Sequence, residues 1–242
     1  MCDPATAAAC LSAPSRMNGV TSSARRSTQP VARAPKQERS QKSFDRVLDS
    51  SLELLAERGY AGFALTEVSR RSGVSTGSIY VRVDGKDDLL RAAQERFLEK
   101  MAGEHARLTD PERYEGKNLV QVVGELVSGL ATMLLRNARV LGAFQQRAVS
   151  DPLVARAGKA SYMDLVGRFS QLLLGHRDEI AHSDPEHAVV SCFQVAYATL
   201  ARTLALDVSQ DAAEDHELAA ITEDLGLMCI AFLTWPGGDA TN

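Results

Sequence analysis

The feature that most constrains this chain is residues 66–90, TEVSRRSGVSTGSIYVRVDGKDDLL, which have the pattern of two short helices, a tight turn between them and the start of a longer helix. Gly73 stands where the first helix must end with a positive φ, a conformation that glycine adopts without steric cost. Ser75 is a good N-cap, because its hydroxyl can accept a hydrogen bond from a backbone N–H in the next turn. The pattern predicts a helix-turn-helix whose second helix extends from about Thr76 to Arg82.

The second helix of such a motif lies in the major groove of DNA, with its N-terminal residues on the base edges. Ile79 should turn inward, while its neighbours stay exposed. The residues expected at the DNA are Ser75 at the helix start, then Thr76, Gly77, Ser78, Val81 and Arg82. The guanidinium of Arg82 suits a guanine edge.

The runs GVSTGSIY and GKDDLL resemble the DNA-binding domain of the TetR family of transcriptional repressors, which has a Gly-Val-Ser turn, a Tyr in the recognition helix and a Lys opening the next helix. The matching residues here are Gly73, Val74, Ser75, Tyr80 and Lys86. The family's first helix and the turn after it are matched by Val47, Leu48, Leu55, Gly59 and Tyr60. The resemblance covers about residues 43–92. It implies that Tyr80 and Lys86, with Thr66 as a weaker candidate, contact DNA phosphates.

Three residues depart from the family pattern. Ala64 stands where a Thr often caps the second helix, so a capping box with Glu67 lacks its first partner, at a cost of about 1 kcal/mol. Val83 replaces an aromatic residue, and Arg82 replaces a His. The first and second departures bear on stability, and Arg82 bears on which DNA is read.

Composition favours an all-α protein, because aromatic residues make up only 5%, alternating β-branched runs are missing, and Ala, Leu, Glu and Arg dominate. Charge is unevenly distributed. Residues 1–92 hold 14 Lys and Arg against 10 Asp and Glu, whereas residues 93–242 hold 13 against 21. A basic N-terminal third suits a polyanion, so the overall net charge of −4 does not argue against DNA binding.

Residues 1–42 are expected to form a disordered basic arm, because they have almost no large apolar side chains to offset the entropy of ordering. They hold seven Lys and Arg against Asp3 and Glu38. Two interpretations stay open. The segment is either a solvated tail, with Met17 as an alternative start, or an arm that adds phosphate or minor-groove contacts.

Helical periodicity predicts a helix-turn-helix domain over residues 43–88 and a helical regulatory and dimerisation domain over residues 89–242. A helix from Lys86 to about Leu108 should join them, with Phe97 and Met101 facing the middle helices. Residues 109–118 are expected to be a loop. Further helices are predicted at 119–135, at 138–149, at 153–175, after the start signal Asp184–Pro185, and before Pro236.

The resemblance further implies a homodimer through the helices near residues 185–206 and 214–235, and a ligand cavity among the middle helices. Six residues are candidates for the lining of this cavity, because they lie in the predicted middle helices or face them: Phe144, Arg147, Tyr162, Met163, Phe169 and Tyr197. The expected protein is a cytoplasmic repressor without a cofactor. It would bind a palindromic DNA operator and be released by a small hydrophobic inducer. An architectural DNA-binding protein without ligand control is the alternative.

The sequence gives little support for a metal site, an enzyme active site or a membrane span. The five histidines lack the HExxH pattern and are expected at the surface, so no metal site is predicted. Asp87 and Asp88 are explained as acids at a helix start, and no polar cluster suggests an all-α enzyme. Cys192 and Cys229 are expected as buried free thiols, with a redox-sensing pair as the alternative. There is no run of about 18 apolar residues, so no membrane span is expected.

Overall fold

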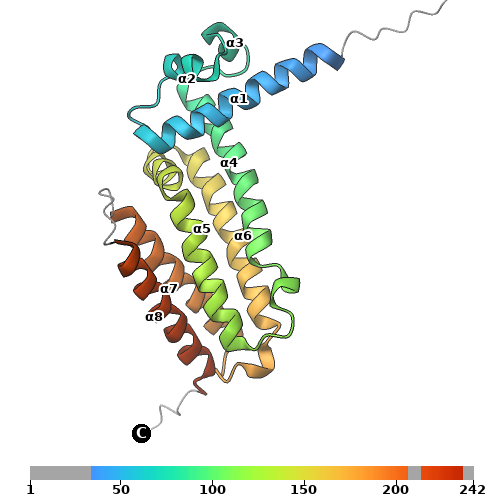
Figure 1. Cartoon of the computed structure of the whole chain (residues 1–242), viewed down its shortest axis with the longest axis vertical. Helices are drawn as coiled ribbons and strands as arrows, with labels where there is room; N and C mark the ends of the chain where they lie inside the picture. The colour runs from blue at the N-terminus through green and yellow to red at the C-terminus, as the bar shows by residue number, and fades with distance from the viewer. Residues whose placement is uncertain (1–33, 207–213, 237–242) are drawn as a thin grey trace, which may run out of the picture.

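The computed structural model describes residues 34–206 and 214–236, and every regular element in those ranges is helical. The all-α prediction is therefore confirmed. Helices α1 (Ala34–Arg58), α2 (Leu65–Ser72) and α3 (Thr76–Tyr80) gather at one end of the molecule, and α4 (Lys86–Leu108) leads from them along the rest (Figure 1). The other helices are α5 (Leu119–Ala148), α6 (Pro152–Leu174), α7 (Pro185–Leu206) and α8 (Glu214–Thr234).

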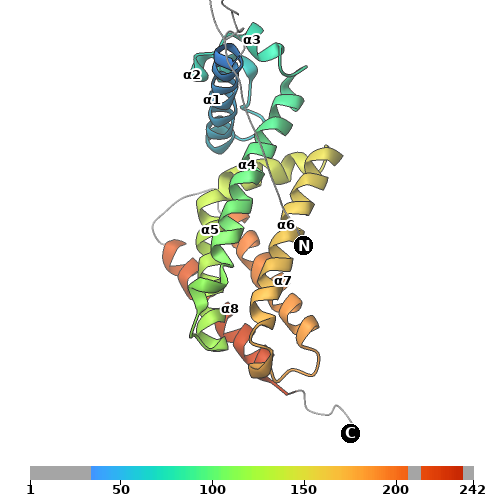
Figure 2. The same ribbon diagram turned by 90° about the vertical axis from the view of Figure 1, so that its right-hand side faces the viewer.

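The larger domain is a bundle in which α5 lies between α4 and α6 on one side and α7 and α8 on the other (Figure 1). The view turned by 90° shows α4 and α6 descending side by side from the helix-turn-helix end (Figure 2). Two short 3₁₀ helices, η1 (Pro111–Tyr114) and η2 (Arg177–Glu179), lie in the turns at the opposite end. The segment 109–118, predicted as a loop, thus contains a helical turn that buries Tyr114.

Local chemistry shapes the helix-turn-helix as predicted. Gly73 has φ 68°, and its N–H bonds to the carbonyl of Ser69, which closes the C-terminus of α2. The Ser75 hydroxyl accepts from the backbone N–H of Ser78 at 3.3 Å and so caps α3. Ala64 caps α2 without a side-chain hydrogen bond, as its missing hydroxyl implied. Ile79 is buried, which fixes the rotation of α3 on the domain core.

The first helix begins at Ala34, nine residues before the predicted start at Ser43, so the expectation of disorder up to residue 42 was wrong for 34–42. The reason is local. This stretch is rich in Lys, Gln, Glu and Arg, which are good helix formers, and Lys42 pairs with Glu38 one turn away at 2.7 Å. Its end projects beyond the domain in Figure 1. The rest of the predicted basic arm, residues 1–33, lies outside the described residues.

The middle of the bundle differs from the predicted pair of helices at 119–135 and 138–149. One continuous helix, α5, covers both segments. Asn137 does not break it, because its side-chain amide bonds to the carbonyl of Met133 at 2.8 Å and to the carboxylate of Glu104 at 3.1 Å. Among the described helices, α5 alone is long and apolar enough to cross a membrane by length and composition. Its apolar face packs against α4, α6, α7 and α8, as in the core helix of a bundle.

Helices α7 and α8 pack together through two buried thiols. Cys192 donates to the carbonyl of Cys229 at 3.7 Å, and Cys229 donates to the carbonyl of Cys192 at 3.8 Å. Contact with Cys229 and burial raise the pKa of the Cys192 thiol, so it stays protonated and unreactive at neutral pH. The prediction of buried free thiols is confirmed for this pair. In α8 Leu225 is buried, whereas Met228 and Trp235 are exposed.

Replacing Gly73 by Ala should lower the free energy of unfolding by about 1–2 kcal/mol, because a β-carbon is strained at positive φ. Gly77 provides the control. It lies within α3, and a β-carbon added there would meet no other atom within 4 Å, so Gly77→Ala should stabilise by about 0.5–1 kcal/mol. Urea denaturation of both variants measures the effect, and equal shifts would contradict this account of the turn.

Candidate DNA-reading surface and ligand cavity

The face of the helix-turn-helix that was predicted to read DNA is open to solvent. Tyr80 is 54% exposed and Val81 is 82% exposed, although both are large apolar residues. An exposed Val beside an exposed Tyr gains nothing from folding, so their placement suits a partner surface. Thr66 on α2, and Ser75, Gly77, Ser78 and Arg82 around α3, are exposed as well.

The side chains of Thr76 and Arg82, like those of Ser75 and Ser78, already have partners within the domain. The Thr76 hydroxyl bonds to the Ser69 hydroxyl at 3.3 Å and is turned towards α2. The Arg82 guanidinium donates to the hydroxyl of Ser40 at 2.7 Å and lies 5.2 Å from the ring centre of Phe44. Contact between Arg82 and a guanine would therefore exchange the Ser40 bond for a base. The early start of α1 is what brings Ser40 to this place.

Lys86 at the start of α4 is held by the turn after α1. Its ammonium donates to the backbone carbonyl of Tyr60 at 3.0 Å and lies 3.9 Å from the centre of the Tyr60 ring. An ammonium carries three N–H donors, so this contact leaves donors for a phosphate. These two contacts with Tyr60 fix the position of the Lys86 ammonium at the start of α4.

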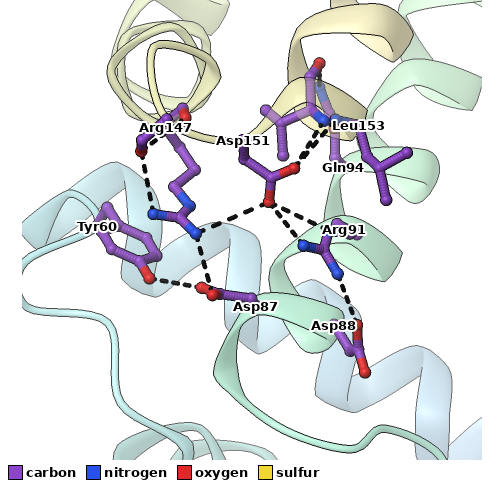
Figure 3. A network of polar contacts seen from close by, with 10 residues as sticks. Tyr60, Asp87, Asp88, Arg91, Gln94, Arg147, Asp151 and Leu153 are labelled. Carbon is purple, nitrogen blue, oxygen red and sulfur yellow. Dashed lines mark hydrogen bonds and ion pairs between the residues drawn. The ribbon is translucent and has the colours of Figure 1, made fainter.

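A polar network connects the helix-turn-helix end to the bundle (Figure 3). Arg147, in the last turn of α5, bonds to the carboxylate of Asp87 at 3.0 Å and lies 4.8 Å from the Tyr60 ring centre. The Tyr60 hydroxyl donates to the same carboxylate at 2.6 Å, which raises the pKa of Tyr60. Arg91, one turn further along α4, bonds to Asp151 at 3.1 Å and to Asp88 at 2.8 Å.

Asp151 is the buried centre of this network. It caps α6 by accepting from the backbone N–H groups of Leu153 and Val154. Burial alone would raise the pKa of Asp151, but the hydrogen bond from Arg91 and those two backbone donors outweigh burial and hold the pKa below its usual value. The carboxylate is therefore charged, and it links α4 to the first turn of α6.

A cavity of about 350 Å³ lies among α4, α5, α6 and α7. Its walls are mostly apolar, with Phe97 and Met101 on α4 facing Phe144 on α5 and Leu165 on α6. The rings of Phe97 and Phe144 pack with their centres 5.6 Å apart. This volume is at the small end of the range of about 300–1,000 Å³ that is usual for ligand pockets.

The cavity includes three of the six residues proposed from sequence as its lining. These are Phe144, Tyr162 and Tyr197. Phe169 is fully buried against Phe193 instead, and Met163 is exposed, contrary to its predicted inward position. Arg147 belongs to the network with Asp87.

Sequence reasoning missed two buried polar residues of the cavity, Gln94 and His105. Both lie on the same face of α4 as Phe97 and Met101. Their spacing of three or four residues from these two is the sequence signal that could have placed them in the cavity. His105 contradicts the expectation that the histidines lie at the surface. It is buried because α4 packs on α6, where Asp164 bonds to its Nδ1 at 3.3 Å.

Comparisons with known proteins agree with this arrangement. A family model described as "Bacterial regulatory proteins, tetR family" matches residues 47–93. No curated protein matches the chain. A TetR transcription regulator from Haloarcula marismortui is similar in structure, with 19% identity and a TM-score of 0.61 over 78% of this chain and 98% of that chain.

Two further solved structures are similar and contain a small molecule. The transcriptional regulator FadR from Bacillus subtilis, in complex with stearoyl-CoA, has 19% identity and a TM-score of 0.57 over 78% of this chain and 98% of that one. A protein from Saccharomonospora viridis, described as a transcriptional regulator in complex with choline, has 15% identity and a TM-score of 0.61, with 76% and 95% coverage. At these identities the likeness is one of fold.

An exposed helix-turn-helix with a helical bundle behind it is the arrangement of a DNA-binding regulator. Residues 47–93 match the tetR family model, and the chain as a whole has the fold of TetR-family regulators of known structure.

Replacing Lys86 by Ala should reduce the slope of log affinity against log salt by about one unit, because one phosphate contact is lost. The variant should lose the same factor in DNA affinity on every operator sequence, because a phosphate contact does not read the bases. Lys117→Ala is the control, since Lys117 pairs with Glu125 at the far end of the bundle. Mobility shifts at several salt concentrations give the slopes, with circular dichroism to confirm folding. An unchanged slope for a folded Lys86→Ala protein would remove Lys86 from the interface.

Proposed function

We propose that the protein is a homodimeric repressor that binds a palindromic DNA operator in the cytoplasm and is released by a small, mainly apolar molecule. One observation carries the proposal. The last turn of α5 presents Phe144 and Ala148 to the cavity and Arg147 to Asp87 at the start of α4. A molecule that displaces this turn therefore acts on the helix that carries Lys86.

A second path supports the same coupling. Val154 lines the cavity, and its carbonyl accepts from Gln94 of α4 at 3.0 Å. One turn earlier, Asp151 holds Arg91. A ligand that moves the first turn of α6 would thus pull on two successive turns of α4. The stearoyl-CoA and choline complexes support the view that regulators of this fold hold small molecules.

DNA recognition is proposed to divide between two groups of residues. Tyr80, Lys86 and Thr66 would contact phosphates and provide affinity for any duplex. Ser75, Gly77, Ser78, Val81 and Arg82 would face the bases and provide specificity. Thr76 would join them once its hydroxyl leaves Ser69. An architectural protein would bind without such preference. Competition between an operator selected from random duplexes and random duplex itself separates these two functions.

Dimerisation is proposed through the exposed face of α7 and α8. Val195, Leu227 and Met228 are each more than half exposed. Val195 lies one turn along α7 from Cys192, and Met228 adjoins Cys229, so both flank the contact between the two helices. A hollow of about 580 Å³ between α5 and α8, which Leu227 lines, adds to this surface.

A charge at Met228 should dissociate the dimer, because it would be buried without a partner in an apolar interface. Met228 is 61% exposed in the single chain, so Met228→Glu should leave the fold intact. Val149→Glu is the control, since Val149 is 90% exposed at the end of α5. In sedimentation at micromolar concentration the control should stay dimeric. A wild-type protein that is monomeric at this concentration would contradict the proposed homodimer.

DNA and ligand should weaken each other's binding by the same factor, because coupling between two sites is reciprocal. At 1.5 Å per residue, Lys86 lies ~20 Å from Met101 along α4. A tilt of α4 would move the two recognition helices out of the spacing of ~34–36 Å that successive major grooves require. We expect a factor of about 5–150 for the wild type. Arg147→Gln should reduce this coupling factor, because the side chain that contacts Asp87 loses its positive charge.

The measurement uses a small molecule that raises the melting temperature of the free protein in a screen. It is titrated by calorimetry with and without the selected operator. Equal ligand affinities in the two titrations would mean that the cavity does not control DNA binding.

A further inference from the structure

The cavity is elongated along α4 and has a buried polar group near each end. Gln94, Phe97, Met101 and His105 follow one another at intervals of three or four residues and share one face of the helix. At 1.5 Å per residue this face spans about 16 Å. Gln94 at the end near the DNA-binding domain uses its amide N–H for the carbonyl of Val154. His105 marks the opposite end.

The hydrogen bond to Asp164 decides which nitrogen of His105 carries the proton. A carboxylate only accepts, so Nδ1 at 3.3 Å from Asp164 must be the N–H. Asp164 is kept charged, because hydrogen bonds from Arg168 and His105 outweigh its partial burial and lower its pKa. In the neutral ring Nε2 is then an acceptor with no proton of its own.

The surroundings keep this ring neutral. Burial lowers the pKa of His105, and Arg168 lowers it further, although Asp164 and Glu104 act in the opposite direction. The side chain is only 4% exposed, and the described residues supply one hydrogen-bond partner, which is at Nδ1. Nε2 of His105 is therefore a hydrogen-bond acceptor that the described residues leave free for a molecule in the cavity.

We propose that His105, oriented by Asp164, determines the specificity of the cavity by accepting a hydrogen bond from a hydroxyl group of the ligand. The ligand class is a small amphipathic molecule with a hydroxyl donor at one end and an apolar body along Phe97 and Met101. This inference rests on the proposed function of the cavity as a ligand site. The hydroxyls of Tyr162 and Tyr197 can both donate and accept, so they do not make the same distinction.

Three probes that share a butylphenyl body test the assignment: para-butylphenol, its methyl ether and butylbenzene. The phenol donates, the ether only accepts, and the hydrocarbon does neither. The wild-type protein should bind the phenol about tenfold more tightly than the ether, because the ether leaves Nε2 buried and unsatisfied. Calorimetry on the full-length protein without DNA gives the three affinities.

Variants separate recognition from a purely structural role. His105→Phe should bind all three probes about equally. Asp164→Asn should lower the preference, because the charge that fixes the tautomer is lost while the volume is kept. His176→Phe is the matched control, since His176 makes a similar pair with Glu179 at 3.1 Å outside the cavity. It should keep the wild-type preference.

Histidine ¹⁵N spectra provide a direct readout. His105 should show the Nδ1–H tautomer in the free protein, and para-butylphenol should shift its Nε2 resonance while the ether does not. Equal binding of the three probes to the wild type, or a preference retained in a folded His105→Phe protein, would overturn the role of His105 and leave the cavity as a ligand site. Binding of none of the probes would overturn both this inference and ligand control by the cavity.

Discussion

The parallel register of α4 and α6 is the constraint on which the rest of the structure depends. Three contacts between these helices join residues that are 60, 60 and 59 positions apart: Arg91 to Asp151, Gln94 to Val154, and His105 to Asp164. Offsets that agree to within one residue mean that one relative placement of the two helices satisfies all three contacts. That placement also sets the width and the polar ends of the cavity.

Buried charge makes this register specific. Asp151 is 2% exposed at its side chain, and it is stable there because Arg91, Arg147 and the start of α6 satisfy its oxygens. Sliding α6 by one residue would leave the carboxylate unpaired, which is costly in a region of low dielectric. Apolar contacts alone would tolerate such a shift more easily, because Leu, Val and Phe pack in several arrangements. The network therefore adds precision to a bundle that the hydrophobic core already stabilises.

The same network gives the two domains a shared boundary. Tyr60 belongs to the turn after α1, Asp87 to the first turn of α4, and Arg147 to the last turn of α5. These three segments meet around one carboxylate, so a change in the bundle reaches the DNA-binding end through few contacts. Rigid helices transmit such a change over their length, since their backbone hydrogen bonds keep the rise per residue fixed. Under the proposed function, this is the path by which a molecule in the cavity beside Phe97 would act on Lys86.

The sequence by itself determined the local features, because each depends on residues a few positions apart. Gly73 ends α2, Ser75 caps α3, and both follow from backbone geometry that neighbouring residues dictate. The start of α1 was missed because its polar first turns are stabilised by helix propensity and an exposed ion pair, without an apolar stripe. Only the tertiary structure decided which residues line the cavity. His105 on α4 and Asp164 on α6 are in contact, although the whole of α5 lies between them in the sequence. No local pattern specifies how far apart the two helices pack or how each is rotated. Phe169 and Met163 show the same limit, since their helix was predicted but the side chains around α6 were assigned to the wrong partners.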